Sequence, residues 1–294
     1  MESPWLHRFA LLLALCTLVL VIDGGGVATV NAGLPPSSAG QSATAPPPPG
    51  VSALFSEQGH RMAGIVVGIL ALGLAIWLSA AAKRRWLANL GWVTLAVAVV
   101  QGLLGGMSGP TGSQGMSVAH ACVAPLFLSL VAAMAVFTSP AWQKGPELGF
   151  DQGWPSLRSL AIFAPLLVLM QIMLGAAFRH KFMGVIPHIG FALLVALVII
   201  IVATFVTQQF PAHSSLAPSA KVLLGITIVQ VMLGMGALWA RMQSVITAPA
   251  LLTATVAHVT VGALTFASSI VLAIQIRRNV QKRPEEEEEV APAV

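Results

Sequence analysis

Residues 56–85 read SEQGHRMAGIVVGILALGLAIWLSAAAKRR: a polar start, a long apolar run and a basic end. The apolar run over 62–82 is long enough to cross a hydrocarbon core of roughly 30 Å as a helix. A helix is the expected form, because lipid offers no partner for backbone N–H and C=O groups. The stretch therefore predicts a transmembrane helix with Glu57, His60 and Arg61 together at one edge of the membrane.

The rest of the chain has the same character. Of its 294 residues, 56% are hydrophobic and only 9% are charged, and the mean hydropathy is +0.86. Soluble domains are about a quarter charged, so the composition excludes an ordinary soluble protein. It predicts an all-α polytopic membrane protein with eight transmembrane helices. The predicted spans cover residues 9–22, 62–82, 87–106, 118–138, 157–178, 184–206, 220–240 and 251–276.

The basic residues predict the orientation, because cytoplasmic loops retain Lys and Arg. With both termini cytoplasmic, all but four of the fifteen basic residues lie on that side. The four outward residues are Arg61, Arg179, Lys181 and Arg241. The pI near 9.9 then reflects topology, and without a basic-aromatic surface we expect no nucleic-acid partner. The lack of an Arg/Ser-rich presequence favours a bacterial plasma membrane.

The ends and the cysteines carry weaker signals. Residues 1–32 have a short apolar core and a VNA sequence, so a cleaved signal peptide is an alternative to a first span. The Pro/Ser/Ala-rich stretch 33–50 predicts an irregular external loop, and 277–294 predict a disordered cytoplasmic tail. Cys16 and Cys122 are expected to be packing residues without a disulfide or a thiolate metal site.

Four of the seven histidines occupy equivalent positions at the outer ends of spans two, four, six and eight. They are His60, His120, His188 and His258. The pattern Q-x-x-x-G precedes the last three of them, at 101–105, 171–175 and 230–234, whereas the first span ends in VIDGGG and matches only the glycines. The repeat predicts two pseudo-symmetric four-helix halves, 1–150 and 151–276, with one histidine pair in each. His7 and His213 are expected to be surface histidines on the cytoplasmic side, and His180 lies in an outer loop.

The residue four positions after each paired histidine is small, and it lies on the same helix face one turn deeper. These residues are Gly64, Ala124, Ala192 and Gly262. A histidine above a missing side chain is shaped to accept a flat macrocycle whose iron the imidazole binds. Small residues also mediate helix packing, which remains an alternative. Because all four histidines lie at one depth, the pairs suit a cofactor beside a substrate or an outer-face electron relay.

An acid distinguishes the first half. The residues three positions before the histidines are Glu57, Ser117, Val185 and Thr255. Ser56 is placed to cap the helix, so Glu57 falls in its first turn on the face of His60. Helix-start electrostatics alone can explain a glutamate there, whereas beside a bound heme the carboxylate could accept or position protons.

At this point the chain resembles the heme A synthase family. The resemblance runs over roughly 55–275. It is carried by SEQGHRMAGIVVGIL, RRWLANLGWVTLAVAVVQGLLGGMSG, AHACVAPLF, QIMLGAAFRHKF and VIPHIGFALL. It implies eight helices in two bundles and the oxidation of a ring methyl of heme O to the formyl group of heme A. Many family members carry a cysteine pair in the first outer loop, which this chain lacks.

The resemblance also implies residue roles. His60 and His120 would flank the substrate heme, with Glu57 as the catalytic acid and base, and His188 and His258 would be the axial ligands of heme B. Outward basic side chains suit heme propionates, and the candidates are Arg61, Arg179 and Arg241. Heme O synthase and an electron acceptor are the implied partners, together with membrane lipid, and a homo-oligomer stays open.

Two other functional classes remain to be weighed. One is a non-catalytic diheme b-type electron carrier or a heme-handling protein, which would need the histidines but not Glu57. A transporter would be expected to carry ionisable groups at mid-membrane, and the sequence places none there.

Overall fold

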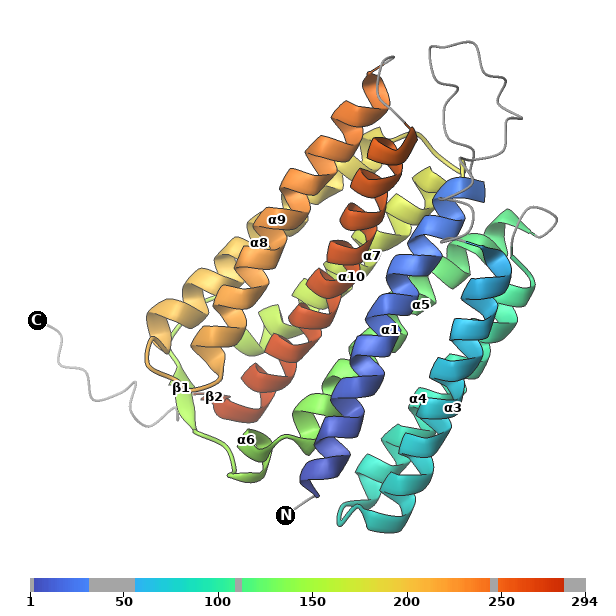
Figure 1. Ribbon diagram of the computed structural model, residues 1–294. Helices are drawn as coiled ribbons and strands as arrows, with labels where there is room; N and C mark the ends of the chain where they lie inside the picture. Colours follow the sequence, from blue (N-terminus) through green and yellow to red (C-terminus); the bar gives the residue numbers. More distant parts are fainter. Residues whose placement is uncertain (1–2, 32–55, 109–112, 244–247, 283–294) are drawn as a thin grey trace, which may run out of the picture.

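The computed structural model describes residues 3–31, 56–108, 113–243 and 248–282, and within them eight long helices (Figure 1). They are α1 (Pro4–Asn31), α3 (Glu57–Ala81), α4 (Arg85–Gly106), α5 (Gln114–Thr138), α7 (Leu157–Arg179), α8 (Ile186–Gln209), α9 (Leu216–Met242) and α10 (Ala248–Asn279). Each is long and apolar enough to cross a membrane. The predicted all-α fold with eight spans is confirmed.

The first helix is twice as long as predicted, because the helix continues through the Asp-Gly-Gly-Gly sequence after residue 22. Glycine is unfavourable in a helix by about 1 kcal/mol relative to alanine. Tertiary packing overrides this preference: α1 contacts α3, α5 and α10, and Leu6 and Leu13 are fully buried. The helix is thus an integral part of the bundle.

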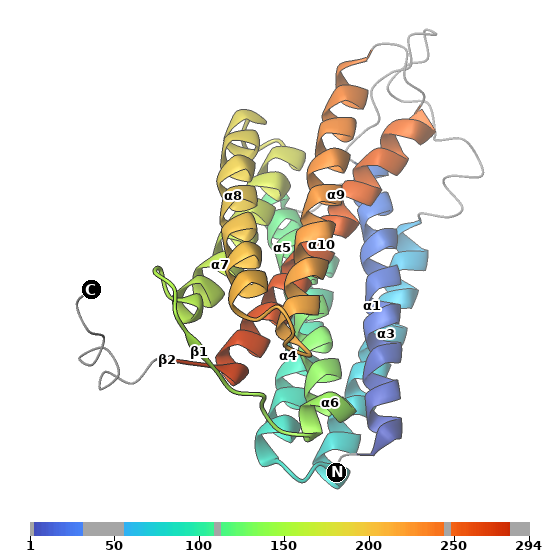
Figure 2. The same cartoon turned by 90° about the vertical axis from the view of Figure 1, so that its left-hand side faces the viewer.

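The helices form two rings of four. In the first ring α1, α3, α4 and α5 contact one another in cyclic order, and in the second α7, α8, α9 and α10 do so. Each ring encloses its own buried core, one including Leu74 and Met134 and the other including Ile199 and Leu223. The rings meet where α10 packs on α1 and α5, around Ala263 (Figure 2). A symmetry relation between the halves stays a prediction.

Large apolar side chains cover the outside of the bundle. Four examples on α3 and α8 have side chains that are more than half exposed: Ile65, Ile69, Leu193 and Leu197. Contiguous exposed apolar surface of this extent marks a contact with lipid or another protein. The pattern therefore agrees with a membrane-spanning chain.

A short two-stranded sheet joins the halves at the end of the bundle where α1 begins and α10 ends (Figure 1). The strand β1 (Gly149–Asp151) pairs in parallel with β2 (Val280–Lys282), and a short helix, α6 (Pro140–Gln143), precedes β1. The chain is therefore ordered beyond 277, where the tail was predicted to begin, because β1 supplies backbone partners. The remainder of the tail, 283–294, and the loop 33–50 lie outside the described residues.

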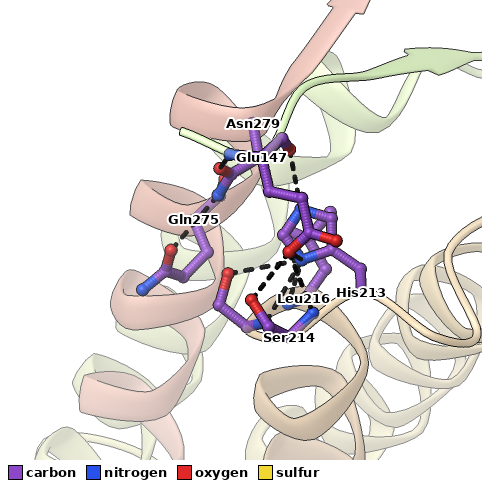
Figure 3. Close-up of polar contacts among 7 residues, drawn as sticks. Glu147, His213, Ser214, Leu216, Gln275 and Asn279 are labelled. Carbon is purple, nitrogen blue, oxygen red and sulfur yellow. Dashed lines mark hydrogen bonds and ion pairs between the residues drawn. The ribbon is translucent and has the colours of Figure 1, made fainter. Parts of the chain in front are cut away.

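His213 is buried at the same end, with 8% of its surface exposed, so the prediction of a surface histidine is wrong. Figure 3 shows its polar contacts. Its Nε2–H donates to the carbonyl of Glu147 at 2.9 Å. Its Nδ1 accepts the backbone N–H of Leu216 at 3.2 Å, which satisfies a free donor at the start of α9. Sequence reasoning missed this because the loop carrying Glu147 comes from the other half of the chain.

Candidate functional site

The four predicted histidines lie in two pairs, one in each ring. The ring centroids of His60 on α3 and His120 on α5 are 6.2 Å apart, with an interplanar angle of 85°. Those of His188 on α8 and His258 on α10 are 6.1 Å apart at 88°. The pairing inferred from the sequence repeat is therefore the pairing in the structure, while iron ligation stays a prediction.

A glycine on the preceding helix positions each imidazole. A Cβ atom added to that glycine would lie within 3.0 Å of the histidine Cε1, closer than real Cβ atoms approach. The four glycine–histidine pairs are Gly24 with His60 at 2.7 Å and, each at 2.9 Å, Gly105 with His120, Gly175 with His188 and Gly234 with His258. Only glycine, which has no Cβ, allows the ring to approach the neighbouring helix this closely. This contact explains the glycine of the Q-x-x-x-G pattern.

The glutamine of the pattern lies one helical turn before the glycine and holds the histidine backbone. Gln101 Nε2 donates to the carbonyl of His120 at 3.0 Å, and Gln171 Nε2 donates to the carbonyl of His188 at 2.9 Å. In the fourth repeat Gln230 packs beside Gly262, where a Cβ would lie 3.0 Å from its Nε2. The pattern was visible in the sequence, but the role of its glutamine was not assigned.

The first histidine has a carboxylate partner instead. Asp23 Oδ2 on α1 lies 2.9 Å from His60 Nδ1, and both side chains are 21% exposed. By contrast, His120 Nδ1 donates to the backbone carbonyl of Gln101 at 3.1 Å. Sequence reasoning missed Asp23. The signal was that the first repeat lacks the glutamine four positions before its glycine and has an acid directly before Gly24 instead.

Glu57 lies in the first turn of α3, as predicted. Ser56 is the N-cap, and its Oγ accepts the N–H of Gly59 at 3.0 Å. Glu57 Oε2 lies 4.0 Å from Arg61 Nη2, and these side chains are 41% and 61% exposed. The carboxylate therefore lies at the N-terminal end of α3, three residues before His60.

The other two predicted propionate contacts have protein partners. Arg179 Nη2, on α7, donates to the carbonyl of Gly25 at 2.7 Å and to Thr29 Oγ1 at 3.2 Å, which links the second ring to α1. Its Nε is buried without a hydrogen-bond partner in the described chain. The guanidinium of Arg241 lies 5.2 Å from the ring centroid of Phe178. A propionate role for these residues stays a prediction.

His180 follows α7 and brings a further titratable group to this end of the bundle. Partial burial lowers its pKa, and the charges of Arg179 and His120 lower it further. A residue of the second half thus lies within electrostatic reach of the first histidine pair. It is expected to be neutral at neutral pH.

The spacing within each pair fits axial ligation of one iron. Two imidazoles on opposite sides of a metal, each with a metal–nitrogen bond of about 2 Å, have ring centres about 6 Å apart. Nowhere in the described ranges do three or more His, Cys, Asp or Glu residues gather as a metal site. Two protein ligands suit a prosthetic group that brings its own in-plane ligands, as heme does. A Cβ on Gly64 or Gly68 would touch nothing within 4 Å, which leaves open space along the helix of His60.

Comparison with known proteins gives two matches. The family model described as cytochrome oxidase assembly protein, COX15-CtaA, matches residues 51–187. The heme A synthase of Methylobacterium radiotolerans is 33% identical over 141 residues, which cover 44% of this chain and 36% of that relative. The aligned region thus spans about a third of the relative's length. The family match includes Glu57, His60 and His120 and ends one residue before His188.

Proposed function

Because residues 51–187 match the family model of the COX15-CtaA cytochrome oxidase assembly proteins, we propose that this chain is a heme A synthase, which oxidises a ring methyl of heme O to a formyl group. The observation that carries the proposal is the pair His60–His120, 6.2 Å apart, with Glu57 three residues before His60 on the same helix. This arrangement would supply two imidazole ligands and a proton acceptor in one place.

The residues of the first ring would have separate roles. His60 and His120 hold the iron of heme O, the substrate, and so fix the position of the macrocycle edge. With water as the oxygen source, oxidation of a methyl to a formyl group releases four protons and four electrons, so the site needs a proton acceptor and the reaction needs an electron acceptor. Glu57 is the candidate, and Arg61 Nη2 lies 4.0 Å from its carboxylate.

The second ring would hold a resident heme B between His188 and His258. Heme B supplies a one-electron carrier when it is bound. At the position that Glu57 has in the first ring, the second has Val185 and Thr255, and the Thr255 hydroxyl donates to its own helix at Leu251 O, 2.8 Å away. Lacking an acid there, this pair is suited to holding a cofactor and not to taking up protons.

The setting follows from the family and the spans. Heme O synthase would supply the substrate, and an electron acceptor would take the electrons released. The protein would lie in the cell membrane with both termini cytoplasmic and the histidine pairs near the outer face. Of the fifteen basic residues, eleven are then cytoplasmic, as the positive-inside rule requires.

The test is to express the protein with heme O supplied and to analyse the extracted hemes by chromatography. We expect heme A or a hydroxylated precursor from the wild type. Glu57→Gln should keep its hemes and lower product formation by about 100-fold or more, which is typical for loss of a general base. Glu147→Gln, at the opposite end of the bundle, is the matched control and should keep activity. A Glu57→Gln protein that forms product at the wild-type rate would support a non-catalytic electron carrier instead.

A further inference from the structure

Of the four paired histidines, His60 has a carboxylate against its ring, in the part of the chain that the structure describes. Asp23 Oδ2 lies 2.9 Å from His60 Nδ1. His120 Nδ1 has a neutral backbone carbonyl, that of Gln101, at 3.1 Å. His188 Nδ1 has the Gln171 amide nitrogen at 3.1 Å, and His258 has the backbone of Gln230 as its partner.

The partner decides which ring nitrogen carries the proton. An ionised carboxylate can only accept a hydrogen bond, so His60 Nδ1 must be the donor. The lone pair of the neutral imidazole is then on Nε2, which is free to bind a metal. A carboxylate that accepts the Nδ1–H also makes the imidazole a stronger electron donor to a metal on Nε2.

Asp23 is held in place from two sides. On one side, the backbone of Gly24, the next residue, packs directly against the His60 ring. On the other side, Arg179 Nη2 binds the carbonyl of Gly25, and Val256 of α10 is 3.8 Å from the position of a Cβ on Gly25. The second ring of helices therefore holds the segment of α1 that carries the carboxylate.

We propose that Asp23 is a positioning residue that holds His60 as the Nδ1–H tautomer and makes it the strongest donor among the four histidines, so that a heme in the first ring has a lower reduction potential than one in the second. The inference rests on the heme ligation in the proposed function. A more electron-donating axial ligand stabilises the ferric over the ferrous state, which lowers the potential.

The test uses the full-length protein loaded with heme B at both histidine pairs, followed by potentiometric titration of the b-type absorbance. His60→Ala identifies the component that belongs to the first pair. Asp23→Asn keeps the side-chain shape without the charge, and Asp23→Ala removes both. We expect both variants to shift this component to higher potential, the second further, and to weaken heme retention there by about 10-fold or more. The component of His188 and His258 should not move.

Thr17→Val is the matched control on α1, because the Thr17 hydroxyl donates only to its own helix at Leu13 O, 2.7 Å away. It should leave both potentials unchanged. A second readout needs no heme: nitrogen NMR of the protein without heme should find the His60 proton on Nδ1 in the wild type, and a mixture of tautomers in Asp23→Ala.

Three outcomes would overturn the proposal. They are an unchanged first-pair potential in Asp23→Ala, an equal shift of both components, and a His60 tautomer that is the same in Asp23→Ala as in the wild type. The result is separable from the proposed function. A wild type that forms no heme A but shows the shift would sink the enzyme assignment and leave the role of Asp23 intact.

Discussion

Gly105 and His120 face each other across α4 and α5 so closely that a Cβ on the glycine would lie 2.9 Å from the imidazole Cε1. Gly175 and Gly234 stand in the same relation to His188 and His258, at the same distance. Each glycine therefore sets the position of a histidine on the next helix. The glycine of the Q-x-x-x-G pattern thus positions a histidine imidazole between two helices.

We expect Gly175→Ala to displace His188 and lower heme retention in the second ring by about as much as removal of the ligand. A methyl group at 2.9 Å from Cε1 forces the ring or the helices to move. Absorbance of the purified protein at b-type wavelengths measures the effect. Gly225→Ala is the control, since a Cβ there would meet nothing within 4 Å. Equal heme content in the two variants would contradict the positioning role.

Replacing His188 or His258 with alanine should remove the b-type absorbance of the second ring, because one axial ligand of the pair is lost. The ring centroids are 6.1 Å apart, so the remaining histidine cannot occupy both ligand positions. His7→Ala serves as the comparison, since His7 lies 3.4 Å from Thr138 Oγ1 at the opposite end. If both single variants kept full absorbance, the ligand assignment would be wrong.

Gln171→Leu should lower the free energy of unfolding by about 1 kcal/mol, within the range measured for hydrogen bonds between membrane helices. The substitution removes the 2.9 Å bond from Nε2 to the His188 carbonyl and leaves that acceptor without its partner. Denaturant unfolding in detergent would measure the change. Gln152→Leu, in the loop after β1, is a comparison at an exposed site whose side chain makes none of the histidine contacts. Gln171→Leu should be the less stable of the two, and equal stability would count against a structural role for the hydrogen bond between Gln171 and His188.

The opposite end of the bundle should loosen in acid. The Ser214 side chain and backbone N–H donate to the Glu147 carboxylate, at 2.7 and 3.2 Å, and lower its pKa below the ordinary 4.5. A pKa lowered by folding means that the contact stabilises the fold above pH 4.5 and that this contribution is lost as the pH falls below it. Hydrogen exchange at the start of α9, followed against pH, would report the loss. In Glu147→Gln, the protection of these amides relative to their intrinsic exchange rates should no longer change over this range.

Much of the architecture follows from the sequence because membrane spans depend on local composition. The apolar runs predicted eight helices, and Ser56 was correctly placed as the cap of α3. The histidine pairs could also be predicted, because a repeat brings equivalent positions to the same depth. The length of α1 could not, because its glycine-rich end contacts His60 of α3, Arg179 of α7 and Val256 of α10, which are distant in the sequence.

The sequence by itself determined the membrane class, the number of helices and the four histidines that form two pairs, because periodic apolar runs and a repeated motif are local properties. Only the tertiary structure decided that Asp23 binds His60, that Arg179 joins the two rings, and that His213 is buried under the loop of Glu147. Each of these contacts joins residues at least 37 positions apart. Such pairs form only once the helices have taken their places around one another, which no local pattern in the chain records.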